Sequence, residues 1–95
     1  MQEGVGSCLM YRIIIRKPAK KFIDRLPLNE KRRIVEAIEQ LPDSGDIKQM
    51  KGHQNKGLFR LRVGEYRIIY SLDDEQLIIY LLDAGNRGEI YRRYS

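Results

Sequence analysis

The sequence has few of the residues that disulfides, metal sites and membrane spans require. Its 95 residues include one cysteine and one histidine, so no internal disulfide can form and no zinc-ligand spacing occurs. No apolar run approaches the roughly 20 residues that cross a bilayer. A signal peptide has a basic residue before a hydrophobic stretch, and the opening segment MQEGVGSCLM has none. These absences predict a cytoplasmic protein with no membrane partner, no metal and no small-molecule cofactor.

Sequence signatures of several enzyme classes are also missing. There is no glycine-rich phosphate loop of the dinucleotide or Walker type, and no local signature of a Ser-His-Asp nucleophile. Asp73 and Asp74 fall in an expected turn, where solvation explains them better than acid–base chemistry. A chain of 95 residues is one small domain. We therefore expect any active site to lie on the surface or in a shallow groove.

Positive charge, by contrast, is in excess. Lys and Arg number 18 against 13 Asp and Glu, which gives a formal net charge of +5. In a small domain this excess points to a polyanionic partner, either nucleic acid or an acidic protein. Solubility alone is the alternative interpretation of the charge.

The hydrophobic pattern begins only after the first residues. Residues 1–9 are Gly-rich and patternless, which indicates a flexible N-terminal extension with Met10 as the functional start. Residues 10–95 are expected to form a single domain. No internal repeat or linker divides this stretch.

Within the domain, the pattern predicts the order β-α-α-β-β-β. The expected strands are 11–15, 58–63, 66–72 and 77–83. Each of the two helices has one apolar stripe. The first stripe is Ala19, Phe22, Ile23 and Leu26, and the second is Ile34, Ala37, Ile38 and Leu41. Asn29 is the expected N-cap of the second helix. Residues 46–57 are expected to form a polar loop that carries His53. The predicted fold class is α+β, a small antiparallel-rich sheet with a two-helix hairpin on one face and a short basic C-terminal tail.

The strongest local signal is a hairpin centred on Gly64-Glu65. Glycine at the first turn position is typical of a two-residue type II′ turn, which fixes the register. One face then collects Phe59, Leu61, Val63, Tyr66, Ile68 and Tyr70, the expected core. The other face collects Arg60, Arg62 and Arg67. Because Arg62 lies directly opposite Arg67, and like charges so placed destabilise a sheet, we favour a bound polyanion over a merely solvated face.

The third strand of this group should lie beside Arg67. With a turn at Asp74-Glu75, Leu82 neighbours Arg67, and Tyr80 neighbours Ile69 on the arginine face. An aromatic ring placed there could stack on a base. Tyr80 is therefore a predicted RNA-binding residue, on the same face as the polyanion-binding candidates Arg60 and Arg62.

An Arg and Tyr site is compatible with RNA cleavage. The RNA supplies its own nucleophile, the 2′-hydroxyl, so neither a metal nor a covalent enzyme residue is required. Guanidinium groups stabilise the charge that develops on the phosphate oxygens. Because the reference pKa is about 10 for Tyr and above about 12 for Arg, much of the rate has to come from positioning the RNA.

Two motifs carry a family resemblance. The segments RLRVGEYRIIY at 60–70 and NRGEIY at 86–91, in the order of elements given above, resemble the RelE/ParE toxin superfamily. The RelE-type resemblance implies the toxin of a type II toxin–antitoxin system, which cuts mRNA in the ribosomal A site and is neutralised by a cognate antitoxin protein. It implies that Arg67 and Arg87 stabilise the phosphate and that Tyr91 transfers a proton or stacks on RNA. Arg60 and Arg62 would hold the RNA backbone.

Three alternatives stay open at this point. Tyr94 is the other candidate for the tyrosine role. The ParE branch, which inhibits DNA gyrase by binding it, has a similar fold, although a gyrase binder has no need of the whole basic and tyrosine set. A non-catalytic module for RNA or ribosome binding is the third.

Overall fold

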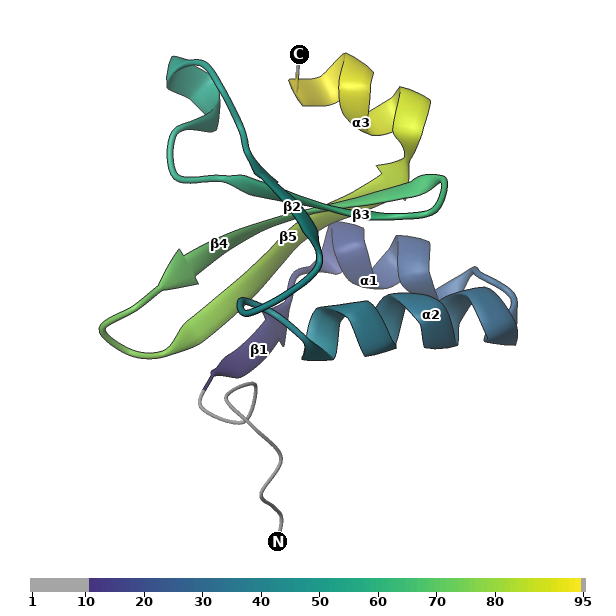
Figure 1. Cartoon of the computed structure of the whole chain (residues 1–95). Coiled ribbons are helices and arrows are strands. Elements are labelled where there is room, and N and C mark those ends of the chain that lie inside the picture. Colours follow the sequence, from purple (N-terminus) through teal and green to yellow (C-terminus); the bar gives the residue numbers. More distant parts are fainter. Residues whose placement is uncertain (1–10, 95) are drawn as a thin grey trace, which may run out of the picture.

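A computed structural model describes residues 11–94 as a five-stranded mixed sheet with two helices on one face and a third helix on the other (Figure 1). The elements are β1 (Arg12–Ile15), α1 (Lys17–Asp24), α2 (Leu28–Glu39), β2 (Asp46–Gln49), the 3-10 helix η2 (His53–Asn55), β3 (Phe59–Val63), β4 (Tyr66–Asp73), β5 (Ile78–Asn86) and α3 (Arg87–Tyr94). The predicted fold class is confirmed. The expected extension at 1–9 and the start at Met10 lie outside the described residues.

The strand order in the sheet is β1-β5-β4-β3-β2. Strand β1 runs parallel to β5, and the other neighbouring pairs are antiparallel. The first and last strands of the chain therefore lie side by side. No helix among residues 11–94 has both the length and the apolar character needed to cross a membrane.

Helices α1 and α2 cover one face of the sheet and form the main core with it. The two predicted apolar stripes supply its helical half, and the inward residues of β3, β4 and β5 supply the other half. The fully or nearly buried members are Ala19, Ile23, Ile34, Ile38, Leu41, Leu61, Ile68, Tyr70, Ile79, Leu81 and Ala84. Prolines open both helices, with Pro18 in the first turn of α1 and Pro27 as the residue before α2. The prediction of Asn29 as N-cap is wrong, because α2 already begins at Leu28.

The β3–β4 hairpin has the predicted register. Val63 pairs with Tyr66 and Arg62 with Arg67 across the two-residue turn. Gly64 has φ 59°, and among residues 11–94 the only non-glycine residue with positive φ is Leu77, so Glu65 keeps negative φ, as a type II′ turn requires. The core face and the arginine face therefore separate as expected.

Two segments contain more regular structure than the sequence predicted. Residues 46–49, expected in a loop, form the edge strand β2 and pair with β3. The C-terminal tail forms α3, which begins with a reciprocal capping box. In that box the Asn86 backbone N–H donates to Glu89 Oε1 (3.2 Å) and the Glu89 N–H to Asn86 Oδ1 (3.1 Å). A short polar strand and a short basic helix both carry weak hydrophobic patterns, which is why periodicity missed them.

The predicted register of β5 is wrong. The β4–β5 connection is wider than two residues, because Asp73 pairs with Ile78 and its carboxylate accepts the backbone N–H groups of Glu75 and Gln76. The register shifts again between Ile69 and Tyr70. As a result Tyr80 lies opposite Ser71 rather than Ile69, and Arg67 faces Gly85 rather than Leu82.

Burial of Tyr70 makes stability depend on alkaline pH. Its side chain is 1% exposed, and burial raises its pKa to about 12, against about 10 in an unfolded chain. The neutral phenol therefore stabilises the fold fully below pH 10, and this contribution is lost as pH rises towards 12. We expect the free energy of unfolding to fall by about 2 kcal/mol more in the wild type than in Tyr70→Phe between pH 9 and pH 12.

Urea unfolding at several pH values measures this difference. Parallel losses of stability in wild type and Tyr70→Phe would assign the alkaline effect to other tyrosines. The comparison with the variant is needed because the pKa of Tyr66 is also raised, mainly by burial.

Candidate functional site

A groove of about 640 Å³ lies on the sheet face opposite α1 and α2. Its walls are β2 with the residues that follow it, the β3–β4 hairpin, and α3. The described residues that line it are Lys48, Gln49, Met50, Lys51, Arg60, Arg62, Gly64, Glu65, Arg67, Arg87, Ile90, Tyr91 and Tyr94. These include six Lys and Arg side chains and one carboxylate, Glu65. The groove is therefore a strongly positive site of a size that suits part of a nucleic-acid strand.

Five of the six site residues predicted from the sequence line this groove together: Arg60, Arg62, Arg67, Arg87 and Tyr91. The sixth, Tyr80, is not among the described residues that line it. The β4–β5 register places Tyr80 beside Ser71, towards the other end of the sheet. The prediction that Tyr80 stacks beside the arginines is therefore wrong.

Arg67 lies at the centre of the positive charge. It is directly opposite Arg62 in the hairpin register. Its pKa is lowered from the ordinary arginine value, first by burial and then by the neighbouring charges of Arg60, Arg62 and Arg87. Repulsion of this kind favours a bound anion, because an anion removes the cost of holding the cations together.

The Arg67 guanidinium is held by backbone carbonyls. Its Nη1 donates to the carbonyl oxygens of Gly64 (2.9 Å) and Tyr66 (3.0 Å). Among residues 11–94, no Asp or Glu forms an ion pair with Arg67. The side chain is thus oriented by the hairpin turn, and no carboxylate in the described part of the chain pairs directly with its charge.

Arg60 and Arg62 share one counter-ion at the edge of the sheet. Asp46 on β2 lies 3.8 Å from Arg60 Nη2 and 3.4 Å from Arg62 Nε. The Nε of Arg60 is buried without a hydrogen-bond partner among the described residues. Asp46 therefore neutralises part of the charge on this wall, and one Arg60 donor remains unused.

The sequence interpretation missed the wall that β2 contributes. Lys48 pairs directly with Arg60, which places another cation on the arginine face, and Lys51 follows beyond the strand. The available signal of a strand, alternation of polar and apolar residues, is confined to Asp46, Ile47 and Lys48, because Gln49 is polar as well. An edge strand with one inward apolar residue, Ile47, gives a weak form of it.

Helix α3 forms the opposite wall and brings Arg87 to Arg67. The Arg87 backbone N–H donates to the Glu65 carbonyl (2.9 Å), which ties the start of α3 to the hairpin turn. Arg67 pairs with Gly85 on β5, and Arg87 follows Gly85 two positions later in the chain. Four arginines that are spread between positions 60 and 87 thus meet through one hairpin and one helix start.

The two tyrosines of α3 have different surroundings. Tyr91 is 72% exposed, whereas Tyr94 is half-buried and its hydroxyl donates to Asp83 Oδ2 (3.1 Å). Burial first, and then the Asp83 charge and hydrogen bond, raise the pKa of Tyr94. Tyr91 is therefore the side chain that is available to a ligand.

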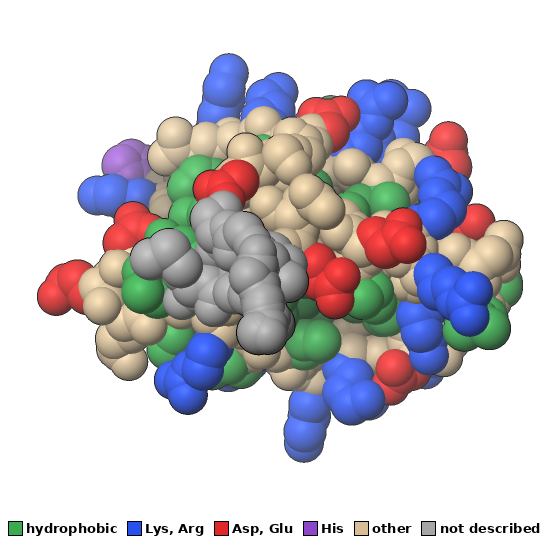
Figure 2. All heavy atoms as spheres, turned by 60° about the horizontal axis from the view of Figure 1, so that its bottom comes forward, with side chains coloured by type: hydrophobic (Ala, Val, Ile, Leu, Met, Phe, Trp, Pro, Cys, Tyr) green, Lys and Arg blue, Asp and Glu red, His purple; other side chains and the backbone are tan. Residues whose placement is uncertain are grey.

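The helical side of the molecule carries charge of both signs. Figure 2 brings that side forward and shows Asp and Glu interspersed with Lys and Arg. Lys20 pairs with Asp24 at 2.8 Å and Arg33 with Glu30 at 3.4 Å. In the groove, by contrast, the described lining residues include six Lys and Arg side chains and one carboxylate.

Comparisons of the sequence with known proteins find matches among proteins described as toxins. Residues 13–91 match the family model described as the ParE toxin of the type II toxin–antitoxin system parDE. Toxin RelG of Mycobacterium tuberculosis is 43% identical over 37 residues, which are 39% of this chain and 42% of that protein, so less than half of this curated relative is matched.

Solved structures are similar over most of the chain. The RelE–RelB complex of Pyrococcus horikoshii OT3 contains a chain with 32% identity and a TM-score of 0.68, covering 83% of this chain and 97% of that one. The toxin–antitoxin complex RelBE2 of Mycobacterium tuberculosis contains a chain with 26% identity and a TM-score of 0.69, covering 81% and 91%.

Proposed function

The chain belongs to the ParE toxin family of type II toxin–antitoxin systems, within the RelE/ParE superfamily, and from this premise we propose that it is a RelE-type endoribonuclease that cuts mRNA in the ribosomal A site. The observation that carries the proposal is the convergence of four arginines and an exposed tyrosine in one groove. A toxin that acts only by binding a protein has no need of this arrangement.

In the proposed reaction, the 2′-hydroxyl of the RNA attacks the neighbouring phosphorus. The O2′–P bond forms and the P–O5′ bond breaks, which leaves a 2′,3′-cyclic phosphate and a 5′-hydroxyl. Arg67 and Arg87 stabilise the negative charge on the phosphate oxygens of the transition state. Arg60 and Arg62 hold the backbone of the strand. The reaction needs no resident metal or cofactor.

Proton transfer is the demanding part of this chemistry. Tyr91, exposed on α3, is the tyrosine that reaches the RNA, because the hydroxyl of Tyr94 is already engaged by Asp83. It transfers a proton or stacks on a base. Since neither Tyr nor Arg has an ordinary pKa near 7, the ribosome contributes by aligning the 2′-hydroxyl with the scissile bond.

A cognate antitoxin is the second proposed partner. The comparison structures from Pyrococcus horikoshii and Mycobacterium tuberculosis are toxin–antitoxin complexes. An antitoxin of this chain would inhibit it with an acidic segment that covers the arginine groove, because such a segment competes with RNA phosphates for the same guanidinium groups.

A primer-extension assay on defined ribosomes tests the proposal. Purified protein is added to ribosomes that carry one mRNA with an empty A site, and to the same mRNA free in solution. We expect a single cut within the A-site codon, a 2′,3′-cyclic phosphate at the new end, and no cut in free mRNA. An intact message on the ribosome would refute the endoribonuclease.

Gyrase inhibition is the second candidate, and the ParE family model favours it. A supercoiling assay with purified gyrase separates the two activities. Loss of supercoiling together with intact ribosomal mRNA would establish the ParE-type activity.

A further inference from the structure

We propose that two buried polar residues outside the groove lining, Asp83 and Asn55, are positioning residues that fix α3 and thereby set the place of Tyr91. The inference rests on the proposed function, since it names what orients the tyrosine of that site. Neither residue was singled out by the sequence motifs, and neither reaches the groove itself among the described residues.

The packing of α3 makes such residues necessary. The helix has eight residues, Arg87–Tyr94, and the one that is buried is Ile90. Helices shorter than about 12 residues are marginal in water on their own. A single apolar contact leaves such a helix free to rotate and slide on the sheet, so polar contacts have to specify where it lies.

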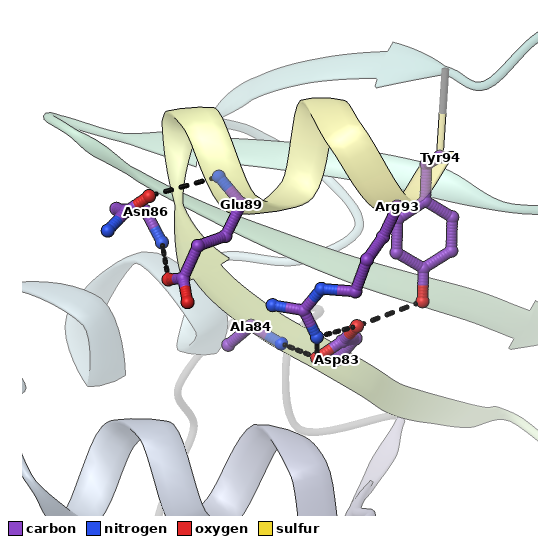
Figure 3. A network of polar contacts seen from close by, with 6 residues as sticks. All are labelled: Asp83, Ala84, Asn86, Glu89, Arg93 and Tyr94. Carbon is purple, nitrogen blue, oxygen red and sulfur yellow. Dashed lines mark hydrogen bonds and ion pairs between the residues drawn. The ribbon is translucent and has the colours of Figure 1, made fainter.

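Asp83 supplies the contacts from the sheet. Its side chain is 8% exposed and projects from β5 towards the last turn of α3 (Figure 3). The carboxylate accepts from Arg93 Nη1 at 2.8 and 3.1 Å, from the Tyr94 hydroxyl at 3.1 Å and from the Ala84 N–H at 2.8 Å. A buried charge with several donors gives strong, directional bonds, which fix both the rotation and the height of the helix.

Asn55 supplies the contact from the other wall of the groove. Its Nδ2 donates to the Lys51 carbonyl (2.9 Å) and to the Tyr94 carbonyl (2.8 Å). Lys51 belongs to the segment that follows β2, and Tyr94 ends α3. The Asn55 side chain therefore bridges the two walls, and this bridge sets the distance between them.

Tyr91 lies between two fixed points. The capping box and the bond from the Arg87 N–H to Glu65 fix the start of α3. Asp83 and Asn55 fix its end through Tyr94. Because Tyr91 is 72% exposed, its own side chain contributes little to its placement. Its position over the groove is inherited from the helix.

These contacts are separate from the main core. Neither Asp83 nor Asn55 belongs to the cluster of buried residues that α1 and α2 form with the sheet. Arg93 is 46% exposed, so it can turn to solvent when its partner is removed. Loss of either contact should thus disturb α3 while the sheet and the other helices keep their structure.

A double-mutant cycle with Tyr91→Ala tests the inference on A-site-empty ribosomes. We expect Asp83→Asn and Asn55→Ala each to lower the single-turnover cleavage rate by about tenfold or more, with ribosome affinity within about twofold. In the Tyr91→Ala background, which lacks both the hydroxyl and the ring, the same changes should alter the rate by less than about twofold, because they act through Tyr91. Asp24→Asn, which removes an exposed carboxylate on the helical side, is the matched control with unchanged rate.

Hydrogen exchange gives a readout that does not depend on activity. The amides of α3 should exchange at least tenfold faster in Asp83→Asn, while those of β4 and the core helices stay as in the wild type. An equal rate loss from Asp83→Asn in the wild-type and Tyr91→Ala backgrounds would overturn the inference, as would unchanged α3 exchange. Absence of cleavage by the wild type would instead refute the proposed function, and exchange would still decide the role of Asp83 in placing α3.

Discussion

Arg67→Ala is expected to lower the rate of mRNA cleavage in the ribosomal A site by a factor of about 100 to 1,000. The reason is that Arg67 combines three properties: it is oriented by two backbone carbonyls, it has no carboxylate partner among residues 11–94, and it lies at the centre of the arginine cluster. A cation placed in this way acts on the transition state without first having to reorganise.

The same substitution should leave stability almost unchanged. Removing Arg67 loses two hydrogen bonds to carbonyl groups. It also removes the burial of a charge and the repulsion from Arg60, Arg62 and Arg87, which together lower the pKa of Arg67. We expect the free energy of unfolding to change by less than about 1 kcal/mol.

Single-turnover cleavage and urea unfolding, measured side by side, check both parts. Arg32→Ala is the matched control, since Arg32 is an exposed arginine on α2, on the far side of the sheet. It should cleave at the wild-type rate. If Arg67→Ala cleaved as fast as Arg32→Ala, the arginine cluster would not be the catalytic site.

Ile68→Ala, one residue further along β4, should have the opposite profile. Ile68 is 0% exposed and belongs to the core beneath α1 and α2. Truncation of a buried isoleucine leaves a cavity and costs about 2–5 kcal/mol, a large part of the roughly 5–15 kcal/mol that holds a domain together. For a domain of this size, the melting temperature should fall by about 10–30 °C.

Thermal unfolding followed by circular dichroism measures this loss. Val35→Ala is the control, because Val35 is a 41% exposed aliphatic residue on α2 and its truncation should cost less than about 1 kcal/mol. At temperatures where Ile68→Ala remains folded, its cleavage rate should be close to that of the wild type. A stability equal to that of the control would contradict the assignment of this face to the core.

Arg67 and Ile68 show why the hairpin was predictable from the sequence. Successive residues of a strand point to opposite faces, and a two-residue turn at Gly64-Glu65 leaves one register. Both rules act over a few residues, so the chain itself determines which side is core and which is cationic. The apolar stripes of α1 and α2 follow from helical periodicity in the same local way.

Tyr80 shows where local rules stop. Its neighbours depend on the length of the β4–β5 connection and on a register shift between Ile69 and Tyr70. Neither has a strong sequence signal, and a shift of register moves a side chain to a different environment. The predicted stacking of Tyr80 beside the arginines was wrong for this reason.

By itself, the sequence determined the α+β class, the core stripes, the arginine face and the candidates Arg60, Arg62, Arg67, Arg87 and Tyr91. Only the tertiary structure decided that they share one groove, that Lys48 and Lys51 complete its wall, and that α3 closes it. The physical reason is that these walls meet through contacts between distant segments, such as Asn55 with Tyr94. Periodicity and turn chemistry encode structure over a few residues, whereas contacts of this range arise only when the sheet has assembled.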